Sequence, residues 1–187
     1  GVLAPLWSRT LDAAVISASV GANTFRTEKL FLLLADRRVI AVSENDSLRV
    51  VGRAPEGATA LVALRTPTFN ASDIALMLTV GAGSGTCDLV AWNRNGQQLW
   101  RSVLPGVDEV DSLFLIGEAE NRIEFCAWQR GAPWLINVVK QLWQYSANAA
   151  RLNPGFTPRD ALVEDFDRDG VPELVFFDGT QLAIYYV

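Results

Sequence analysis

The fold of this 187-residue chain is decided by residues 165–173, which read DFDRDGVPE. Carboxylates occupy the first, third, fifth and ninth positions of this stretch, and Gly170 precedes the last of them. Alternate carboxylates can direct oxygen atoms toward one point, and a glycine permits the sharp turn that brings later groups to the same ion. The spacing therefore predicts a loop that binds a hard divalent cation.

Short apolar segments on both sides of this loop predict strands. Residues 161–163 precede it, and residues 173–177 form an apolar and aromatic run that ends at Asp178-Gly179. A helix-loop-helix calcium hand would need a bidentate glutamate at the twelfth position, which here is Phe176. The loop is therefore expected to join two strands of a hairpin.

A loop of the form D-x-D-x-D-G-x-x-[DE] between two short strands resembles the integrin-type FG-GAP repeat, also described as the VCBS repeat, of β-propeller proteins. The resemblance covers residues 161–179. It implies one Ca²⁺ ion, held by the side chains of Asp165, Asp167, Asp169 and Glu173 and by the carbonyl of Val171. The family pattern has Asp at the last ligand position, so the glutamate lengthens that arm by one methylene. The alternative is an acidic hairpin turn without an ion.

Internal repeats support a propeller beyond the loop itself. Leu-Trp pairs begin at Leu6, Leu99 and Leu142, and a degenerate copy begins at Leu48. The intervals between successive copies suit four-stranded blades of about 40 to 50 residues each. The strands are predicted at residues 15–20, 30–35, 39–43, 48–52, 60–64, 74–80, 88–93, 98–103, 112–117, 123–129, 134–139, 141–146, 161–164, 173–177 and 181–187.

These observations predict an all-β fold over residues 1–187, a single small β-propeller domain with four blades. The blades are expected at residues 12–52, 58–104, 111–147 and 160–187 together with 6–11. The last blade has three strands of its own, so we expect residues 6–11 to supply the fourth and to close the ring. A β-sandwich and a fragment of a larger propeller are the alternative folds.

Composition excludes several functions. The net charge is −5, the pI is about 4.8 and the basic residues are scattered, so nucleic-acid binding is not expected. The longest apolar run, residues 30–35, is far shorter than the roughly 20 residues of a transmembrane segment. No secretory signal opens the sequence, and we expect that such a signal has been removed.

The residue inventory also restricts catalysis. The chain has no histidine, and its two cysteines, Cys87 and Cys126, do not form a spaced metal motif. Zinc, haem and copper sites and Ser-His-Asp triads are therefore not expected. The two cysteines can be either paired or free. No catalytic residues are assigned, although a carboxylate pair of the kind used in glycoside hydrolysis stays open in principle.

The resemblance implies a non-catalytic calcium-binding module for recognition or scaffolding. It also implies an extracellular, periplasmic or cell-surface setting, where calcium is abundant enough to fill a weak site. The expected partner is another protein, and the chain could be an accessory subunit of a larger assembly. A glycan-binding lectin is the first alternative, for which Trp134 is the tryptophan expected to be exposed. A hydrolase or lyase on a propeller is the second.

Overall fold

The computed structural model describes most of the chain. The described residues are 8–20, 28–43, 45, 47–64, 74–81, 85–119, 121–129, 131–141 and 144–186. Within them the protein forms fifteen β-strands and no helix, which confirms the all-β prediction.

The strands form four antiparallel sheets, each built from strands that follow one another in the chain. The first sheet contains β1 (Val15–Val20), β2 (Glu28–Leu34), β3 (Arg38–Ser43) and β4 (Leu48–Arg53). The second contains β5 (Ala58–Ala63), β6 (Leu76–Gly81), β7 (Cys87–Trp92) and β8 (Gln98–Leu104). The third contains β9 (Ser112–Ala119), β10 (Arg122–Gln129), β11 (Ala132–Gln141) and β12 (Gln144–Arg151). The fourth contains β13 (Asp160–Glu164), β14 (Glu173–Phe177) and β15 (Leu182–Tyr186).

The strand positions agree with the sequence prediction to within a few residues, except for β12. This strand was predicted at residues 141–146, but the β11–β12 hairpin is longer, and its pairing runs from Gln141↔Gln144 to Trp134↔Arg151. The four separate sheets also differ from a β-sandwich, which has two.

Glycine permits one close approach between the first two sheets. Gly96 lies in the turn between β7 and β8 with a φ angle of +76°. A Cβ atom at this position would lie 2.3 Å from the carbonyl oxygen of Val51 in β4. Only glycine fits both the left-handed backbone and the contact.

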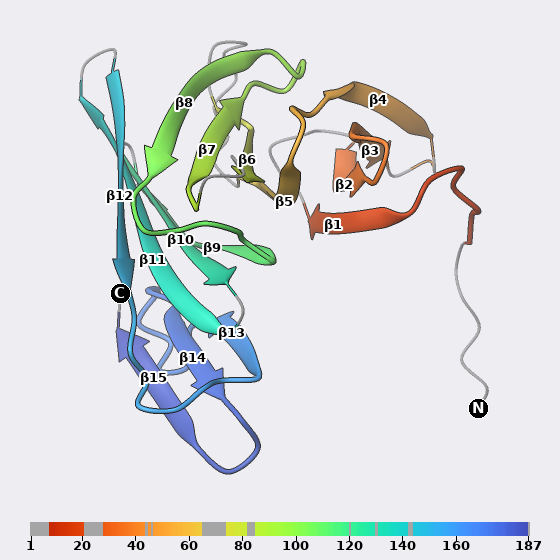
Figure 1. The fold of residues 1–187 in the computed structure, drawn as a ribbon. Coiled ribbons are helices and arrows are strands. Elements are labelled where there is room, and N and C mark those ends of the chain that lie inside the picture. The colour runs from red at the N-terminus through yellow and green to blue at the C-terminus, as the bar shows by residue number, and fades with distance from the viewer. Residues whose placement is uncertain are drawn as a thin grey trace, which may run out of the picture.

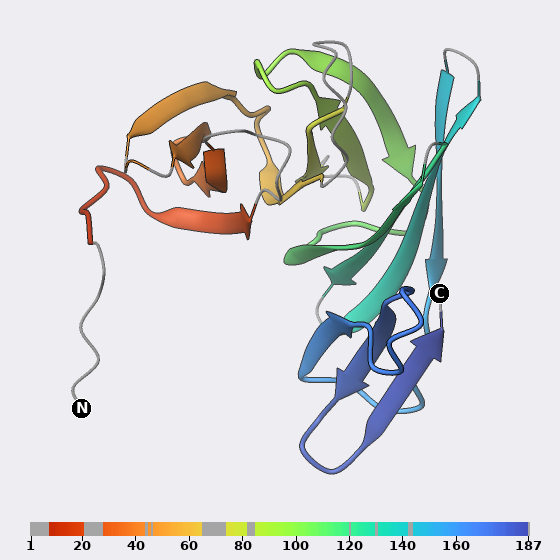
Figure 2. The ribbon, with the colours of Figure 1, turned by 180° about the vertical axis from the view of Figure 1, so that it is seen from behind.

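The four sheets stack in chain order along an open arc, which both ribbon views show (Figures 1 and 2). Apolar clusters fill the spaces between consecutive sheets. Phe31 and Val90 belong to the cluster between the first and second sheets, and Leu89 and Phe125 to the cluster between the second and third. Phe176 packs between the third and fourth sheets. The first strands β1, β5, β9 and β13 lie along the inner side of the arc.

The predicted ring closure is wrong. Residues 8–11 form no strand, and the fourth sheet has three strands among the described residues. Leu11 packs instead against Leu32, Leu34 and Ile40 of the first sheet, at the opposite end of the arc from β15. Leu6 and Trp7, which began the predicted closing strand, lie outside the described residues. The prediction failed because the partly buried side chain of Leu11 packs on the first sheet.

Candidate metal site

The acidic loop lies at one end of the fourth sheet, between β13 and β14. The ladder of these two strands ends at the pair Glu164↔Glu173, so the intervening residues are free of strand pairing. Arg168 and Gly170 have φ angles of +62° and +92°. A Cβ on Gly170 would meet no atom within 4 Å, so glycine is favoured here by the backbone angle alone. The turn reverses the chain within a short loop, as the spacing predicts.

Backbone N–H groups of the loop hold each of its four carboxylates by one oxygen. The bonds run from Phe166 N to Glu173 Oε2 (2.8 Å), from Gly170 N to Asp165 Oδ2 (3.0 Å), from Asp169 N to Asp167 Oδ1 (3.1 Å) and from Val171 N to Asp169 Oδ1 (2.8 Å). Such bonds orient a carboxylate and leave its second oxygen to bind another group. The loop is therefore ordered by its own backbone.

Three carboxylates converge within this loop. Asp165, Asp167 and Glu173 each offer one oxygen, and these oxygens lie within 4.8 Å of one another. Glu173 is buried, Asp165 is half-buried and Asp167 is exposed. In the part of the chain that the structure describes, no other group of three acidic or cysteine side chains converges in this way.

One oxygen of this group lacks a hydrogen bond. Asp165 Oδ1 is buried and has no partner among the described residues. A buried carboxylate oxygen without a donor or a cation is costly, and crowded carboxylates repel one another. A hard divalent cation would satisfy this oxygen and neutralise the repulsion, because carboxylate oxygens are the ligands that calcium prefers.

The other two predicted ligands, Asp169 and the carbonyl of Val171, are not part of this group of three carboxylates. Asp169 lies outside the group of converging oxygens, and its Oδ1 atom accepts from the N–H of Val171. Val171 is exposed at the loop surface. The neighbouring turn between β14 and β15 carries Asp178, which is half-buried and whose pKa is lowered by hydrogen bonds from the backbone N–H groups of Thr180 and Gln181. These bonds stabilise the negative charge of Asp178 without an ion.

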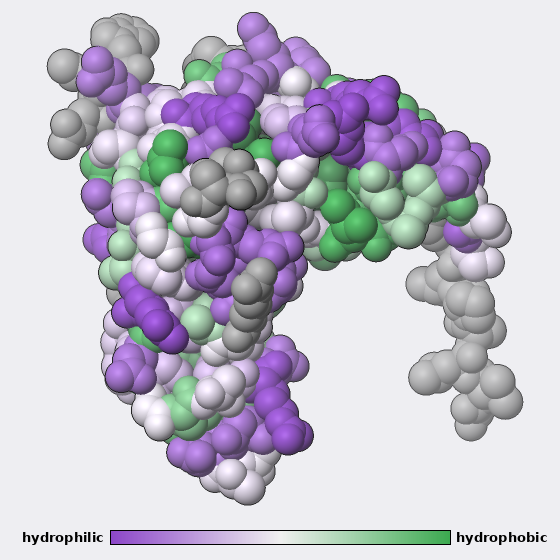
Figure 3. All heavy atoms as spheres, viewed as in Figure 1, coloured by the Kyte–Doolittle hydropathy of each residue, from purple (hydrophilic) through white to green (hydrophobic). Residues whose placement is uncertain are grey.

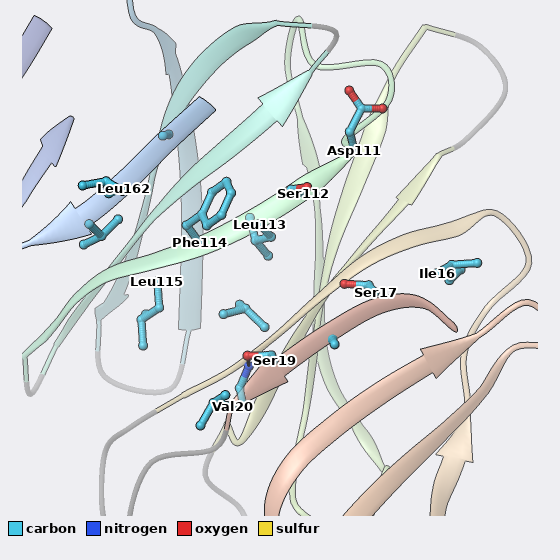
Figure 4. Close-up of a pocket in the computed structure, with 15 residues that line it drawn as sticks. Ile16, Ser17, Ser19, Val20, Asp111, Ser112, Leu113, Phe114, Leu115 and Leu162 are labelled. Atoms are coloured by element: carbon cyan, nitrogen blue, oxygen red, sulfur yellow. Dashed lines mark hydrogen bonds between the residues drawn. The ribbon is translucent and has the colours of Figure 1, made fainter. Parts of the chain in front are cut away.

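A hollow lies on the inner side of the arc, apart from the acidic loop. It has a volume of about 540 Å³ and is lined by the first strands of all four sheets (Figure 4). Two of its hydroxyl groups are already used: Ser17 Oγ accepts from the N–H of Leu61 at 3.0 Å, and Ser19 Oγ accepts from the N–H of Ala63 at 2.9 Å. These bonds join β1 to β5 across two sheets. The sequence does not indicate these bonds, because serines that alternate with apolar residues also suit a solvent-facing strand surface.

The two cysteines and Trp134 belong to the packing between the sheets. Cys87 and Cys126 are free and buried in different apolar clusters, and burial raises their thiol pKa values to about 11 and about 12. Trp134, expected to be exposed, is half-buried against the core between the second and third sheets. Its indole N–H is buried without a partner among the described residues. A membrane-spanning helix is absent from the described residues.

No protein-family model matches this chain, and a search of curated proteins finds no match. The assignment of function therefore depends on the geometry of the chain itself.

Proposed function

We propose that this protein is a calcium-binding, non-catalytic module for recognition or scaffolding, built from propeller-type sheets of the FG-GAP kind. The convergence of Asp165, Asp167 and Glu173 around the buried, unpartnered Asp165 Oδ1 atom carries the proposal. The chemistry of this group, three carboxylate oxygens on a backbone-ordered loop, suits Ca²⁺ better than a softer metal.

The ion would act on the structure of the fourth sheet. Glu173 is the first residue of β14, and Asp165 follows the last residue of β13. A cation shared by these two side chains would link both strands at the loop end of their hairpin. It would stabilise the hairpin and supply no reactive group.

The proposed location of the protein, outside the cytosol, follows from the calcium affinity expected of such a site. Sites in extracellular modules bind calcium with Kd values of about 10⁻⁴ to 10⁻³ M. A site of this strength fills outside the cytosol, so we place the protein in an extracellular, periplasmic or cell-surface environment. Its partner in this proposal is another protein.

The inner hollow gives less support to a hydrolase or lyase. Such an enzyme would need a cluster of carboxylates or tyrosines in the hollow. Among the described residues that line it, Asp111 is the single carboxylate. A glycan-binding lectin is also less well supported, because Trp134, the tryptophan expected to stack on a sugar ring, is half-buried.

Calorimetric titration tests the binding step. The chelated protein is titrated with CaCl₂, and we expect one site per chain with a Kd of about 10⁻⁴ to 10⁻³ M. Asp165→Asn should abolish the binding heat, because it removes the charge of the unpartnered carboxylate. Asp178→Asn, a substitution in the neighbouring turn, should leave the titration unchanged. A wild-type chain that binds no calcium at millimolar concentration would refute the proposal.

A further inference from the structure

The turn between β7 and β8 carries a sequence that can modify itself. Residues 93–97 read NRNGQ, so Asn95 is followed directly by Gly96. In an Asn-Gly pair the backbone nitrogen of the glycine can attack the side-chain Cγ atom of the asparagine, because glycine has no Cβ to obstruct the approach. This is the one Asn-Gly pair in the sequence. Asn95 is exposed, so its side chain is open to water.

The reaction needs water and no other reagent. The Gly96 nitrogen gives up its proton and bonds to Asn95 Cγ, and the side-chain amide group takes up a proton and leaves as ammonia. Water then opens the resulting cyclic imide at either carbonyl, which gives aspartate or isoaspartate. Both products carry a new negative charge, and no atom is oxidised or reduced. In isoaspartate the backbone is one methylene longer.

The folded turn holds the attacking nitrogen in another bond. Gly96 N donates to Asn93 O at 3.0 Å, and Asn93 N donates to Gln97 O at 3.0 Å. Asn93 Oδ1 accepts from the N–H groups of Asn95 and Gln97, each at 3.0 Å. Asn93 is 2% exposed, so these bonds are sheltered from water. For the reaction to begin, Gly96 N would have to leave its acceptor and rotate toward the side chain of Asn95.

The first sheet blocks this rotation from the other side. A Cβ atom on Gly52 of β4 would lie 3.5 Å from the Cα atom of Gly96 and 3.2 Å from Cζ3 of Trp92. A Cβ atom on Gly96 would collide with the carbonyl of Val51. The two backbones therefore lie in contact, and the peptide bond before Gly96 has no room to turn unless the turn and β4 separate.

The contact lies at the surface, where water is available. Both ribbon views place the end of the β7–β8 hairpin beside β4 (Figures 1 and 2). The surface at this junction is hydrophilic (Figure 3). Hydrolysis of the imide is therefore not limited by access of water, and the step that the fold controls is the attack by Gly96 N.

We propose that Asn95 is a deamidation site that the contact between β4 and the β7–β8 turn protects. The modification then marks chains in which the first and second sheets have separated at this point. Isoaspartate at position 95 would lengthen the backbone between Asn93 O and Gly96 N. The turn could then keep neither the bond between these two atoms nor its close approach to Val51, so the reaction would make the separation permanent.

Peptide mapping by mass spectrometry tests the proposal on the protein itself. The folded protein is incubated at pH 8 and physiological temperature, and a second sample is kept at the same pH and temperature in guanidinium chloride. The fraction of the Asn95 peptide in which OH has replaced NH₂ is followed with time. We expect the reaction to be at least about tenfold slower in the folded protein, which corresponds to a free energy of local opening of about 1.4 kcal/mol.

A substitution in the other sheet separates the effect of the contact from that of the turn sequence. Gly52→Val leaves residues 93–97 unchanged but places a branched side chain against Trp92 and Gly96. It should push the turn away from β4 and speed deamidation of Asn95 in the folded protein. Val50→Ala is the matched control, because Val50 lies on the same strand and is 56% exposed. This control should react at the wild-type rate.

Hydrogen exchange provides a measurement that needs no variant. The amide hydrogen of Gly96 is carried by the attacking nitrogen, so its exchange in the wild-type chain should be slowed by the same opening that limits deamidation. Circular dichroism and melting curves establish whether the Gly52→Val chain is folded. If it does not fold, the exchange of this amide and the comparison of folded with unfolded wild type decide the question.

Three results would overturn the proposal. They are equal rates of Asn95 deamidation in the folded and unfolded chain, a folded Gly52→Val variant that reacts no faster than the wild type, and a Gly96 amide that exchanges as fast as in an unfolded chain. The calcium concentration is the same in all samples, and Asn95 is not part of the acidic loop. The outcome therefore leaves the proposed metal site unaffected.

Discussion

Removal of calcium should lower the melting temperature of this protein by an amount that can be estimated from the site. A ligand that binds the folded state alone stabilises it by RT ln(1 + [L]/Kd). With a Kd of about 10⁻⁴ to 10⁻³ M and about 10 mM calcium, this is about 1.4 to 2.7 kcal/mol. For a chain of this size the shift corresponds to about 3 to 11 °C.

Glu173→Gln is the most specific substitution for this experiment, because it changes the charge of the side chain and little else. Glu173 is 2% exposed, and its Oε2 atom accepts from the N–H of Phe166 at 2.8 Å. Glutamine keeps the shape and an acceptor oxygen but loses the charge that binds the ion. The variant should show no calcium-dependent shift. In chelator it should melt no lower than the wild type, because one of three crowded negative charges is gone.

Thermal unfolding followed by circular dichroism, in CaCl₂ and in chelator, measures both effects. Asp160→Asn is the control, because Asp160 is exposed at the opposite end of β13 and should keep the full shift. Magnesium chloride at equal ionic strength controls for screening. A Glu173→Gln variant with the full calcium shift would refute the assignment of this side chain as a ligand.

Three further predictions concern the packing of the sheets. Phe176→Ala should cost about 3 to 5 kcal/mol in urea unfolding, because Phe176 is fully buried between the third and fourth sheets. Cys87 and Cys126 should resist alkylation at pH 8 in the folded protein and react on unfolding, because burial raises their pKa values to about 11 and about 12. Ser19→Ala should cost about 1 to 3 kcal/mol and speed amide exchange at Ala63, whose N–H would lose its acceptor.

Two of these predictions have a control variant within the chain. Phe166→Ala removes a phenylalanine that is 53% exposed and should change stability little. Ser19→Thr keeps the hydroxyl and should protect the amide of Ala63 as serine does. Rapid alkylation of the folded protein would contradict the buried thiols, and equal unfolding curves for the two phenylalanine variants would contradict the packing of Phe176.

Local sequence patterns predicted the strands because each sheet is built from neighbouring segments. Alternating or continuous apolar runs, separated by turn residues, define hairpins without long-range information. The β7–β8 hairpin is an example, since its turn residues include Asn93, Asn95 and Gly96, which favour turns, and Gly96 N donates to Asn93 O there. The boundaries of β12 were missed because nothing in its polar sequence, QYSANAAR, indicates where an outer strand ends.

The convergence of three carboxylates in the loop was predictable for the same reason, and its details were not. The converging Asp165, Asp167 and Glu173 lie within nine residues of sequence, so their spacing alone brings them together. The spacing does not distinguish Asp169 from Asp165 and Asp167, and all three side chains accept backbone N–H bonds alike. Ring closure depends on the angle between stacked sheets and on where Leu11 packs, and no local pattern encodes either.

Every hydrogen-bonded ladder in the four sheets joins strands that are consecutive in the chain. A whole sheet could therefore be duplicated or deleted during evolution without breaking a ladder in those that remain. Such a gain or loss would lengthen or shorten the arc by one sheet. A chain of this design could change its length by recombination, while the architecture of each remaining sheet stayed the same.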